Sequence, residues 1–299
     1  MRIRHLHYFL IVAEEQSFTR AATRVHIEPS PLSRAIKELE NQLGVELLQR
    51  TKGRIQLTWP GEVFREEARR IIAFFENAQT RVHSASQGYH GRLRIGLTDN
   101  LAQPRMTTLL ARCREEEPRT EVRITEMTVN EMLIALRHNQ IDVGFTVDHS
   151  STPGYIKEAI WSERPAIAIP TRHPLLSHEK IPITETLRYP LVLCHPERWA
   201  GGYNVIRRWL NDSSSPSPAL NVAEYVSGHE PMIMLVAAGY GVGIGLKSQI
   251  ALYNHPEVIV REAAEDAPSA TTFAVTIEMN RPPELERFIK RARAIGEEL

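Results

Sequence analysis

Side chains that can contact phosphates and base edges gather near residue 30 at intervals of about one helical turn. They are Ser30, Ser33, Arg34 and Lys37. In a helix these positions share one face. Arginine and lysine hold phosphate groups, and serine hydroxyls can reach the edges of bases. The spacing therefore indicates a polar, basic surface that suits nucleic acid.

The residues around this surface predict a helix-turn-helix. A first helix is indicated by apolar residues at helical spacing, namely Leu6, Phe9, Leu10 and Ala13. Ser17 is the expected N-cap of a second helix over 18–25. A third helix has Ser30 as its expected N-cap and Pro31 at its first position, where the missing N–H costs nothing. Its apolar stripe consists of Leu32, Ile36, Leu39 and Leu43, and Gly44 ends it.

A basic turn follows the third helix, between strand-like segments at 46–48 and 55–58. The turn contains Arg50, Lys52, Gly53 and Arg54. Such a wing can reach the backbone or the minor groove of DNA. The alternative is a solvated helical hairpin with incidental charge. We favour the wing because spacing, caps, exposed face and turn all agree.

The net charge of the chain is zero, but the charged residues are unevenly distributed along it. Its 299 residues contain 36 Lys and Arg against 36 Asp and Glu. Residues 1–60 hold nine basic and six acidic side chains, and the remainder holds 27 and 30. The first 60 residues are therefore the part of the chain whose charge suits DNA.

A long helix is predicted after Pro60. Its apolar residues are separated by steps of four and three, as in the a/d seam of a coiled coil, and they are Phe64, Ala68, Ile71, Phe75, Ala78 and Val82. We expect two such helices to pair, and the glycines at 88–91 to end the helix. The alternative is a single amphipathic helix packed on its own domain, because the seam lasts less than three heptads.

Beyond residue 91, strands and helices alternate, which predicts two α/β lobes. The first is a βαβαβ unit with a parallel sheet, with strands at 93–97, 121–126 and 142–147 and helices at 106–113 and 130–137. A second alternation runs through 166–246. The chain then returns to a strand from residue 271 and a helix at 284–295. The cleft between the lobes is the default ligand site.

Other chemistries find little support. The glycines of 239–245 follow a helix and lead into a strand, the reverse of a dinucleotide-binding turn, so we expect a helix stop and close packing. The histidines lack metal-ligand spacing, and no nucleophile elbow occurs. Cys113 and Cys194 are expected to be buried small hydrophobes and not a disulfide, metal site or redox switch. We expect no metal and no cofactor.

A membrane location is not expected either. No apolar run approaches the roughly 20 residues of a membrane span, and the first residues lead into no secretory signal. We therefore expect the protein to stay in the cytoplasm.

The sequence resembles the LysR-type transcriptional regulators. We call the basic segment of residues 1–60 the head. The resemblance there lies in residues 18–22, 31–34, 39–40, 43–44, 50–51 and 57–58, and it continues in Gly61, 142–144 and 236–241. It covers the whole chain, and the head motif is the more specific part. The implied fold class is α+β and α/β, with a winged helix-turn-helix at 1–60, a dimerising linker helix at 61–89 and an effector-binding domain at 90–299. This last domain resembles a periplasmic binding protein, with a first lobe at 90–163 and 268–299 and a second at 164–267.

The resemblance also implies partners. Members of the family bind double-stranded promoter DNA as homodimers, usually assembled into homotetramers, and activators among them contact RNA polymerase. A small-molecule co-inducer between the lobes, usually a carboxylate, changes the bend of the DNA. The implied DNA-binding residues are Arg20, Pro29, Ser30, Pro31, Ser33, Arg34, Lys37, Arg50, Lys52 and Arg54.

Two departures from the family pattern affect the DNA contacts. Pro29 stands where the family usually has a glutamine that reads a base edge, and Ala35 stands where a second glutamine is common. Base reading would then fall on Ser30 and Ser33, with Arg34 and Lys37 on phosphates. In the wing, Gly53 replaces a frequent arginine.

By resemblance, the effector lies where the first strand of the α/β part ends, at Thr98, Asp99 and Asn100, with Thr128 from the next strand-helix junction. Hydroxyl groups and N–H groups at helix N-termini can hold a carboxylate. Asp99 would oppose an anion unless it points away, so a neutral or mixed-charge effector stays open. The further candidates are Trp199, Gly201 and Gly202 from the second lobe, with Phe145 and His229 at the cleft.

A rival interpretation is a solute-binding or catalytic α/β protein with an accessory basic domain. Salt-sensitive binding to DNA separates the two, because phosphate contacts weaken with salt. We predict a transcriptional regulator that is not an enzyme.

Overall fold

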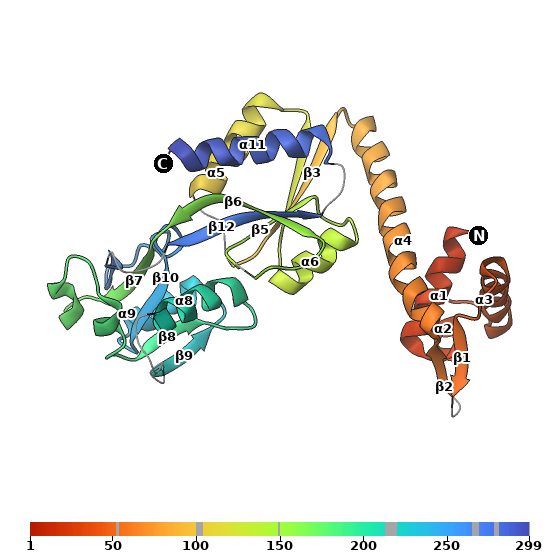
Figure 1. Ribbon diagram of the computed structural model, residues 1–299, viewed down its shortest axis with the longest axis horizontal. Helices are drawn as coiled ribbons and strands as arrows, with labels where there is room; N and C mark the ends of the chain where they lie inside the picture. Colours follow the sequence, from red (N-terminus) through yellow and green to blue (C-terminus); the bar gives the residue numbers. More distant parts are fainter. Residues whose placement is uncertain are drawn as a thin grey trace. The chain divides into compact units, whose positions relative to one another are not determined.

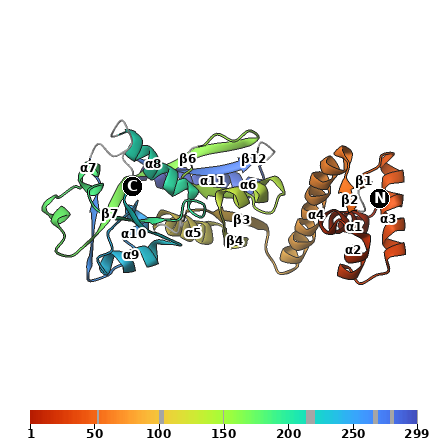
Figure 2. The same ribbon diagram turned by 90° about the horizontal axis from the view of Figure 1, so that it is seen from below.

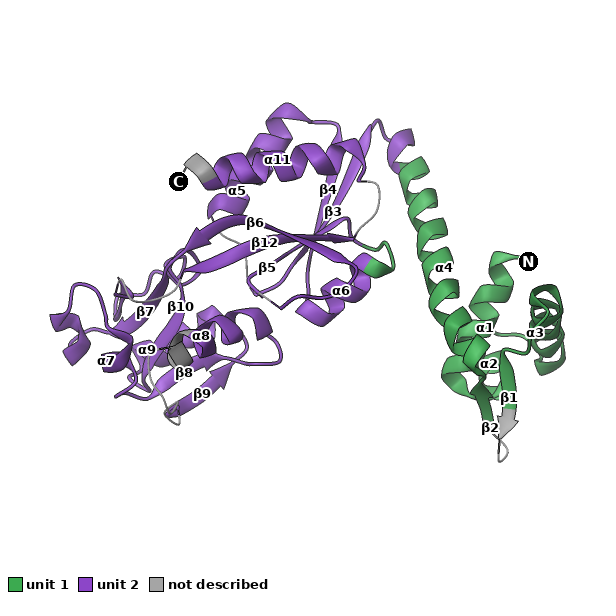
Figure 3. Ribbon diagram, viewed as in Figure 1, with its two compact units in different colours: residues 1–83, 137–140 green, residues 84–136, 141–299 purple. Residues whose placement is uncertain are grey.

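The structure is a computed structural model that describes residues 1–51, 54–99, 104–148, 150–212, 220–264, 269–277 and 281–298. It divides into two compact units, one of residues 1–83 and 137–140 and the other of 84–136 and 141–299 (Figure 3).

The first unit begins with three helices and a two-stranded sheet. These are α1 (Ile3–Glu15), α2 (Phe18–Arg24), α3 (Pro29–Leu43), β1 (Leu48–Thr51) and β2 (Arg54–Leu57). Apolar stripes of the three helices meet in one core, which includes Leu6, Phe9, Ala21, Leu32, Ile36 and Leu39. Ser17 caps α2 by accepting from the backbone N–H of Arg20, and Gly44 ends α3 at a φ of +72°. The helix-turn-helix predicted from the spacing is therefore present.

The start of α3 differs from the sequence prediction. Its N-cap is Glu28, whose side chain makes no capping bond, and Pro29 already belongs to the helix. Ser30 was expected to be the cap, which is wrong. The first turn of a helix has no intrahelical partner for its N–H groups, so it can hold both Pro29 and Pro31 without loss of a hydrogen bond.

The two strands of the wing are antiparallel, with Leu48 opposite Leu57 and Thr51 opposite Arg54. Glu40 on α3 connects the recognition helix to this hairpin. Its Oε1 accepts the backbone N–H groups of Leu47 and Leu48 at 2.8 and 3.1 Å. The base of the wing is thus positioned by a side chain of α3.

A 28-residue helix, α4 (Trp59–Ser86), follows the wing directly. The Thr58 hydroxyl accepts the N–H of Gly61 at 3.0 Å and donates to the carbonyl of Glu46 at 2.7 Å. A Cβ at Gly61 would lie 2.0 Å from the carbonyl oxygen of Leu47. The helix start and the wing base are therefore in direct contact, and Gly61 is required for it.

The second unit contains two five-stranded sheets. The strands of the first are β3 (Gly91–Leu97), β4 (Thr120–Glu126), β5 (Val143–Thr146), β6 (Tyr155–Glu163) and β12 (Ala270–Ile277), in the order β4-β3-β5-β12-β6. β3 runs parallel to β4 and β5, and β12 runs antiparallel to β5 and to β6. β6 and β12 lie side by side in both views (Figures 1 and 2).

Three helices cover this first sheet. They are α5 (Pro104–Glu116), α6 (Val129–Arg137) and α11 (Pro283–Glu298). α5 and α11 pack together on one face, over a core that contains Phe145, Trp161 and Phe288, and α6 covers the other face (Figure 1).

The second sheet has the order β11-β7-β10-β8-β9. Its strands are β7 (Pro165–Pro170), β8 (Leu191–Cys194), β9 (Val222–Val226), β10 (Val242–Leu246) and β11 (Val258–Glu262). The accompanying helices are η1 (Pro174–Ser177), α7 (Ile183–Thr186), α8 (Ala200–Asp212), α9 (His229–Ala237) and α10 (Lys247–Ile250). The chain enters this lobe between β6 and β7 and leaves it between β11 and β12.

The glycines of 239–245 stop a helix and permit close packing, as the sequence predicts. Gly239 follows α9 with a φ of +81°. A Cβ at Gly241 would lie 2.3 Å from the carbonyl oxygen of Pro190, and one at Gly243 would lie 2.8 Å from the side chain of Met232. The segment therefore joins α9 to β10 and presents no phosphate loop.

Both cysteines are free and buried, as expected. Across the described ranges, no group of three metal-ligating side chains occurs. The helices in the same ranges include none that is both long and apolar enough for a membrane span.

Candidate functional site

The exposed face of α3 carries the residues predicted to contact DNA. Leu32, Ile36 and Leu39 are buried, so the helix turns its other side outward. That side consists of exposed residues, namely Pro29, Ser30, Pro31, Ser33, Arg34 and Lys37. Within the described part of the chain, Arg34 and Lys37 form no ion pair, which leaves both charges available to an outside partner.

The other predicted DNA contacts are placed less favourably or lie outside the described residues. Arg20 is exposed on α2, but its guanidinium lies 3.5 Å from a carboxylate oxygen of Glu15. Lys52 lies outside the described residues. The backbones of Arg50 and Arg54 belong to β1 and β2, and their side chains are not among those described.

The predicted a/d seam of α4 divides into two parts. Phe64 and Ala68 pack on the core of the head, where the Phe64 ring meets Phe9 edge-to-face at 5.1 Å. The first turns of α4 are needed to close this small core, and the place of these two residues in a dimer seam stays a prediction. The remaining seam residues are exposed, namely Ile71, Phe75, Ala78 and Val82.

Phe74 was missed by the sequence prediction and is the more exposed neighbour of Phe75, at 67% against 41%. It falls between the a and d positions of the heptad, so the strict seam pattern did not select it. On a straight helix, Phe74 shares a face with Ile71 and Ala78. We define Ile71, Phe74, Phe75, Ala78 and Val82 as the α4 stripe.

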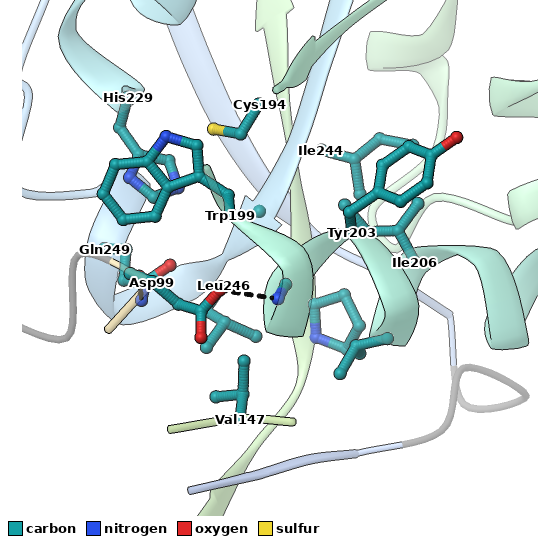
Figure 4. A pocket seen from close by; sticks show the side chains of 14 residues that line it. Asp99, Val147, Cys194, Trp199, Tyr203, Ile206, His229, Ile244, Leu246 and Gln249 are labelled. Carbon is teal, nitrogen blue, oxygen red and sulfur yellow. Dashed lines mark hydrogen bonds between the residues drawn. The ribbon is translucent and has the colours of Figure 1, made fainter. Parts of the chain in front are cut away.

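A pocket lies between the two sheets of the second unit (Figure 4). Its lining comes from the residues directly after β3 and β5 and from β7, β8, α8, α9, β10 and α10. Most of the wall is apolar, with Val147, Ile206, Ile244 and Leu246 and the rings of Trp199 and Tyr203. The cavity volume is about 30 Å³, enough for roughly two or three water molecules.

Asp99 is the acidic residue of this pocket, and its carboxylate points toward α8. Its Oδ1 accepts the backbone N–H of Gly202 at 3.0 Å, drawn as a dashed line in Figure 4. Its Oδ2 accepts from the hydroxyls of Thr98 at 2.6 Å and Thr146 at 3.3 Å. Thr98 and Asp99 directly follow β3 and Gly202 is in the first turn of α8, so the carboxylate joins the two lobes.

The backbone around Asp99 is adapted to this contact. Asp99 has a φ of +53°, in the left-handed region that non-glycine residues seldom adopt. Its carbonyl oxygen accepts from Nε2 of Gln249 at 2.8 Å, a second bond to the other lobe. A Cβ at Gly201 would lie 2.4 Å from Oδ2 of Asp99, so the glycine makes room for the carboxylate.

Burial shifts the pKa values of three pocket groups. Burial raises the pKa of the Asp99 carboxyl, while the hydrogen bonds from Thr98, Gly202 and Thr146 act to lower it. Burial lowers the pKa of His229 to about 4, so this imidazole is neutral at pH 7. Burial, with a smaller contribution from Asp99, raises the pKa of Cys194 to about 12, which leaves an unreactive thiol.

Several predicted effector residues do not line the pocket. Phe145 is buried in the core of its lobe, stacked on Trp161 at 5.8 Å, because alternate residues of β5 face that core. Thr128 caps α6 through its hydrogen bonds with Glu131. Thr98 is fully buried behind Asp99. Asn100 lies outside the described residues.

Other predicted effector residues lie at the pocket. Asp99, Trp199, Gly202 and His229 line it, and Gly201 adjoins Asp99. Tyr203, Ile206, Ile244 and Gln249 were missed. The sequence offers no signal for them, since apolar residues on α8 and β10 are what any packed lobe requires.

Two family models match the chain, and both describe one family. Residues 3–62 match the bacterial regulatory helix-turn-helix protein of the lysR family, and residues 86–296 match the LysR substrate binding domain. The chain belongs to the LysR family. The resemblance inferred from the head motif is thereby confirmed, as is the fold of a helix-turn-helix followed by a two-sheet α/β domain.

LysR-family relatives extend over most of the chain. The HTH-type transcriptional regulator YnfL of Escherichia coli K12 is 32% identical over 82% of this chain and 82% of its own. The HTH-type transcriptional regulator ClcR of Pseudomonas putida is 30% identical over 86% of each. Both relatives are transcriptional regulators by name, and neither name denotes an enzyme.

A solved structure of a LysR-family regulator has the same architecture. Full-length CbnR in complex with its target DNA matches with a TM-score of 0.70 and 25% identity, covering 99% of this chain and 100% of that one. As a LysR-type regulator, the present chain combines a DNA-binding helix-turn-helix with a domain that binds small-molecule effectors.

Proposed function

We propose that the chain binds promoter DNA through α3 and the wing, and that a small molecule in the inter-lobe pocket changes its action on transcription. The observation that carries the DNA part is the face of α3, where Ser33, Arg34 and Lys37 are exposed opposite a buried stripe. The observation that carries the effector part is the pocket beside Asp99.

The proposal assigns a separate function to each of three segments. Residues 1–60 bind DNA, 61–89 dimerise, and 90–299 bind the effector, with one lobe at 90–163 and 268–299 and the other at 164–267. The exposed α4 stripe supports dimerisation, because apolar side chains on a long helix gain most by pairing with a second copy. We further propose that dimers assemble into tetramers.

The proposed activity is regulation and not enzymatic catalysis, and its place is the cytoplasm, because that compartment holds the promoter DNA. The pocket supports a binding role. Its histidine is neutral and buried, and its cysteine has a raised pKa, so neither provides a nucleophile or an acid near pH 7.

An electrophoretic shift with the full chain tests the DNA part. The probe is the intergenic DNA upstream of the chain's own gene, and the matched control is the same fragment with its sequence shuffled. We expect tighter binding to the native fragment and a steep loss of affinity between 50 and 200 mM salt, about 1000-fold or more if six phosphates are contacted. Binding that ignores salt, or equal binding to both fragments, contradicts the proposal.

A further inference from the structure

Asp99 fills the position in the pocket where donors converge. The N–H of Gly202 belongs to the first turn of α8, a 13-residue helix whose N-terminal N–H groups favour an anion. The hydroxyls of Thr98 and Thr146 point at the same carboxylate. Three donors from three elements therefore serve a carboxylate that the chain itself supplies.

Two further donors of the pocket have acceptors within the chain. Trp199 donates its Nε1–H to the carbonyl of Ser227 at 2.8 Å, and Gln249 donates to the carbonyl of Asp99. The described lining contains no lysine and no arginine. A ligand carboxylate would thus lie beside Asp99 in an apolar cavity without a cation, a placement that burial penalises strongly.

We propose that the Asp99 carboxyl group fills the pocket's own acceptor position, and that the pocket accepts a largely apolar small molecule and excludes carboxylates. The ligand contacts the rings of Trp199 and Tyr203 and the side chains of Ile206 and Ile244. This inference rests on the proposed function, since it takes the pocket as the effector site. The cavity of about 30 Å³ requires either a ligand of a few heavy atoms or movement of the lobes.

The first test removes the carboxylate and returns it as a free molecule. Asp99→Gly deletes the side chain at a position where a φ of +53° suits glycine, and acetate carries the carboxyl group that is deleted. We expect a lower melting temperature of the effector-binding unit in the full chain. Sodium acetate at 50 mM should then raise it by about 2 °C or more over equal sodium chloride.

Two proteins serve as controls for this rescue. The wild type already holds its carboxylate, and Asp99→Asn keeps the volume filled, so acetate should change neither. An equal acetate effect in all three proteins, or none in Asp99→Gly, overturns the idea that the Asp99 carboxyl group fills the acceptor position of the pocket.

The second test uses the wild-type full chain and so does not depend on the folding of a variant. Saturation-transfer NMR compares two molecules of one shape, 2-methylpropan-1-ol and 2-methylpropanoate. We expect transfer to the alcohol only, and its loss in Ile206→Phe, which fills the pocket. Transfer to the carboxylate, transfer to neither molecule, or transfer unchanged in Ile206→Phe overturns the proposal.

Neither test involves DNA. If the electrophoretic shift fails while acetate rescue and alcohol binding succeed, the proposed role as a regulator is rejected and the proposed ligand class is supported. If promoter binding succeeds and these two tests fail, the proposed function is supported and the proposed ligand class is rejected.

Discussion

Ser33 and Arg34 are neighbours on the exposed face of α3, but their chemistry assigns them different contacts. A guanidinium on a phosphate binds every sequence, whereas a hydroxyl at a base edge discriminates. We expect Arg34→Ala to weaken binding to native and shuffled DNA by a similar factor and to reduce the salt slope by about one. Ser33→Ala should change the ratio between the two. Fluorescence anisotropy with both duplexes measures this, with the exposed Glu38→Ala as control, and equal ratios in both variants contradict it.

His229 should make the stability of the effector-binding unit depend on pH. Its pKa is about 4 in the folded chain, against 6.5 for the ordinary residue, because burial disfavours the imidazolium. Below pH 6.5 the unfolded chain therefore gains a proton that the folded chain does not. The free energy of unfolding should fall as the pH decreases from 6.5 to 4, by at most about 1.4 kcal/mol per pH unit from this group.

Thermal melts of His229→Phe across this pH range test the expectation. The variant keeps a ring against Trp199 and Tyr253 but cannot titrate, so its melting temperature should depend less steeply on pH. His195→Gln, at an exposed position, is the matched control and should retain the wild-type slope. A slope in His229→Phe equal to that of the wild type would show that another group is responsible.

The residues of the pocket were only partly predictable. Asp99 was selected by resemblance to the family, as a residue where the first strand of the α/β part ends, and the sequence showed that its charge conflicts with an anionic ligand. What resolves the conflict is the position of α8, whose Gly202 is 103 residues away along the chain and donates its N–H to the carboxylate. No local pattern encodes such a contact, and the same holds for Gln249 and Ile244.

At the scale of elements, the α4 stripe supports a prediction about assembly. Phe74→Glu with Phe75→Glu places two charges where two apolar stripes would meet, and we expect the full chain to lose its dimer. Light scattering measures the mass, and Glu76→Arg, at an exposed position on the other side of the helix, should leave the mass unchanged. A double variant that keeps its mass would exclude the stripe from the interface.

Strong periodicity and caps made most elements predictable. The helices of the head, the strands of the first βαβαβ unit and α11 were expected from these signals. β6 and β11 were not, because neither has a clear alternation of buried and exposed residues. β6 is paired along its length with β12, more than 100 residues away, with an irregularity at Thr272 and Phe273. Tertiary pairing, and not local propensity, defines these strands.

At the scale of the whole molecule, the net charge of zero is the sum of a basic head and a slightly acidic remainder. A surplus of three charges in residues 1–60 is small for one head, so firm binding requires several heads on one DNA. We expect the double variant of Phe74 and Phe75 to bind promoter DNA with about half the salt slope of the wild type, since one head then replaces two. Anisotropy between 50 and 200 mM KCl gives both slopes. Equal slopes would mean that a single head makes all the phosphate contacts.

The contact of Gly61 with Leu47 couples the movement of α4 to that of the head. The carbonyl of Leu47 lies where a Cβ of Gly61 would be, and Thr58 bonds to both sides of the junction. Together with the bonds from Glu40 to the base of the wing, these contacts hold α3, the described part of the wing and the start of α4 to one another. The start of α4 therefore moves together with the head, and a rotation of its axis turns α3, the recognition helix, through the same angle.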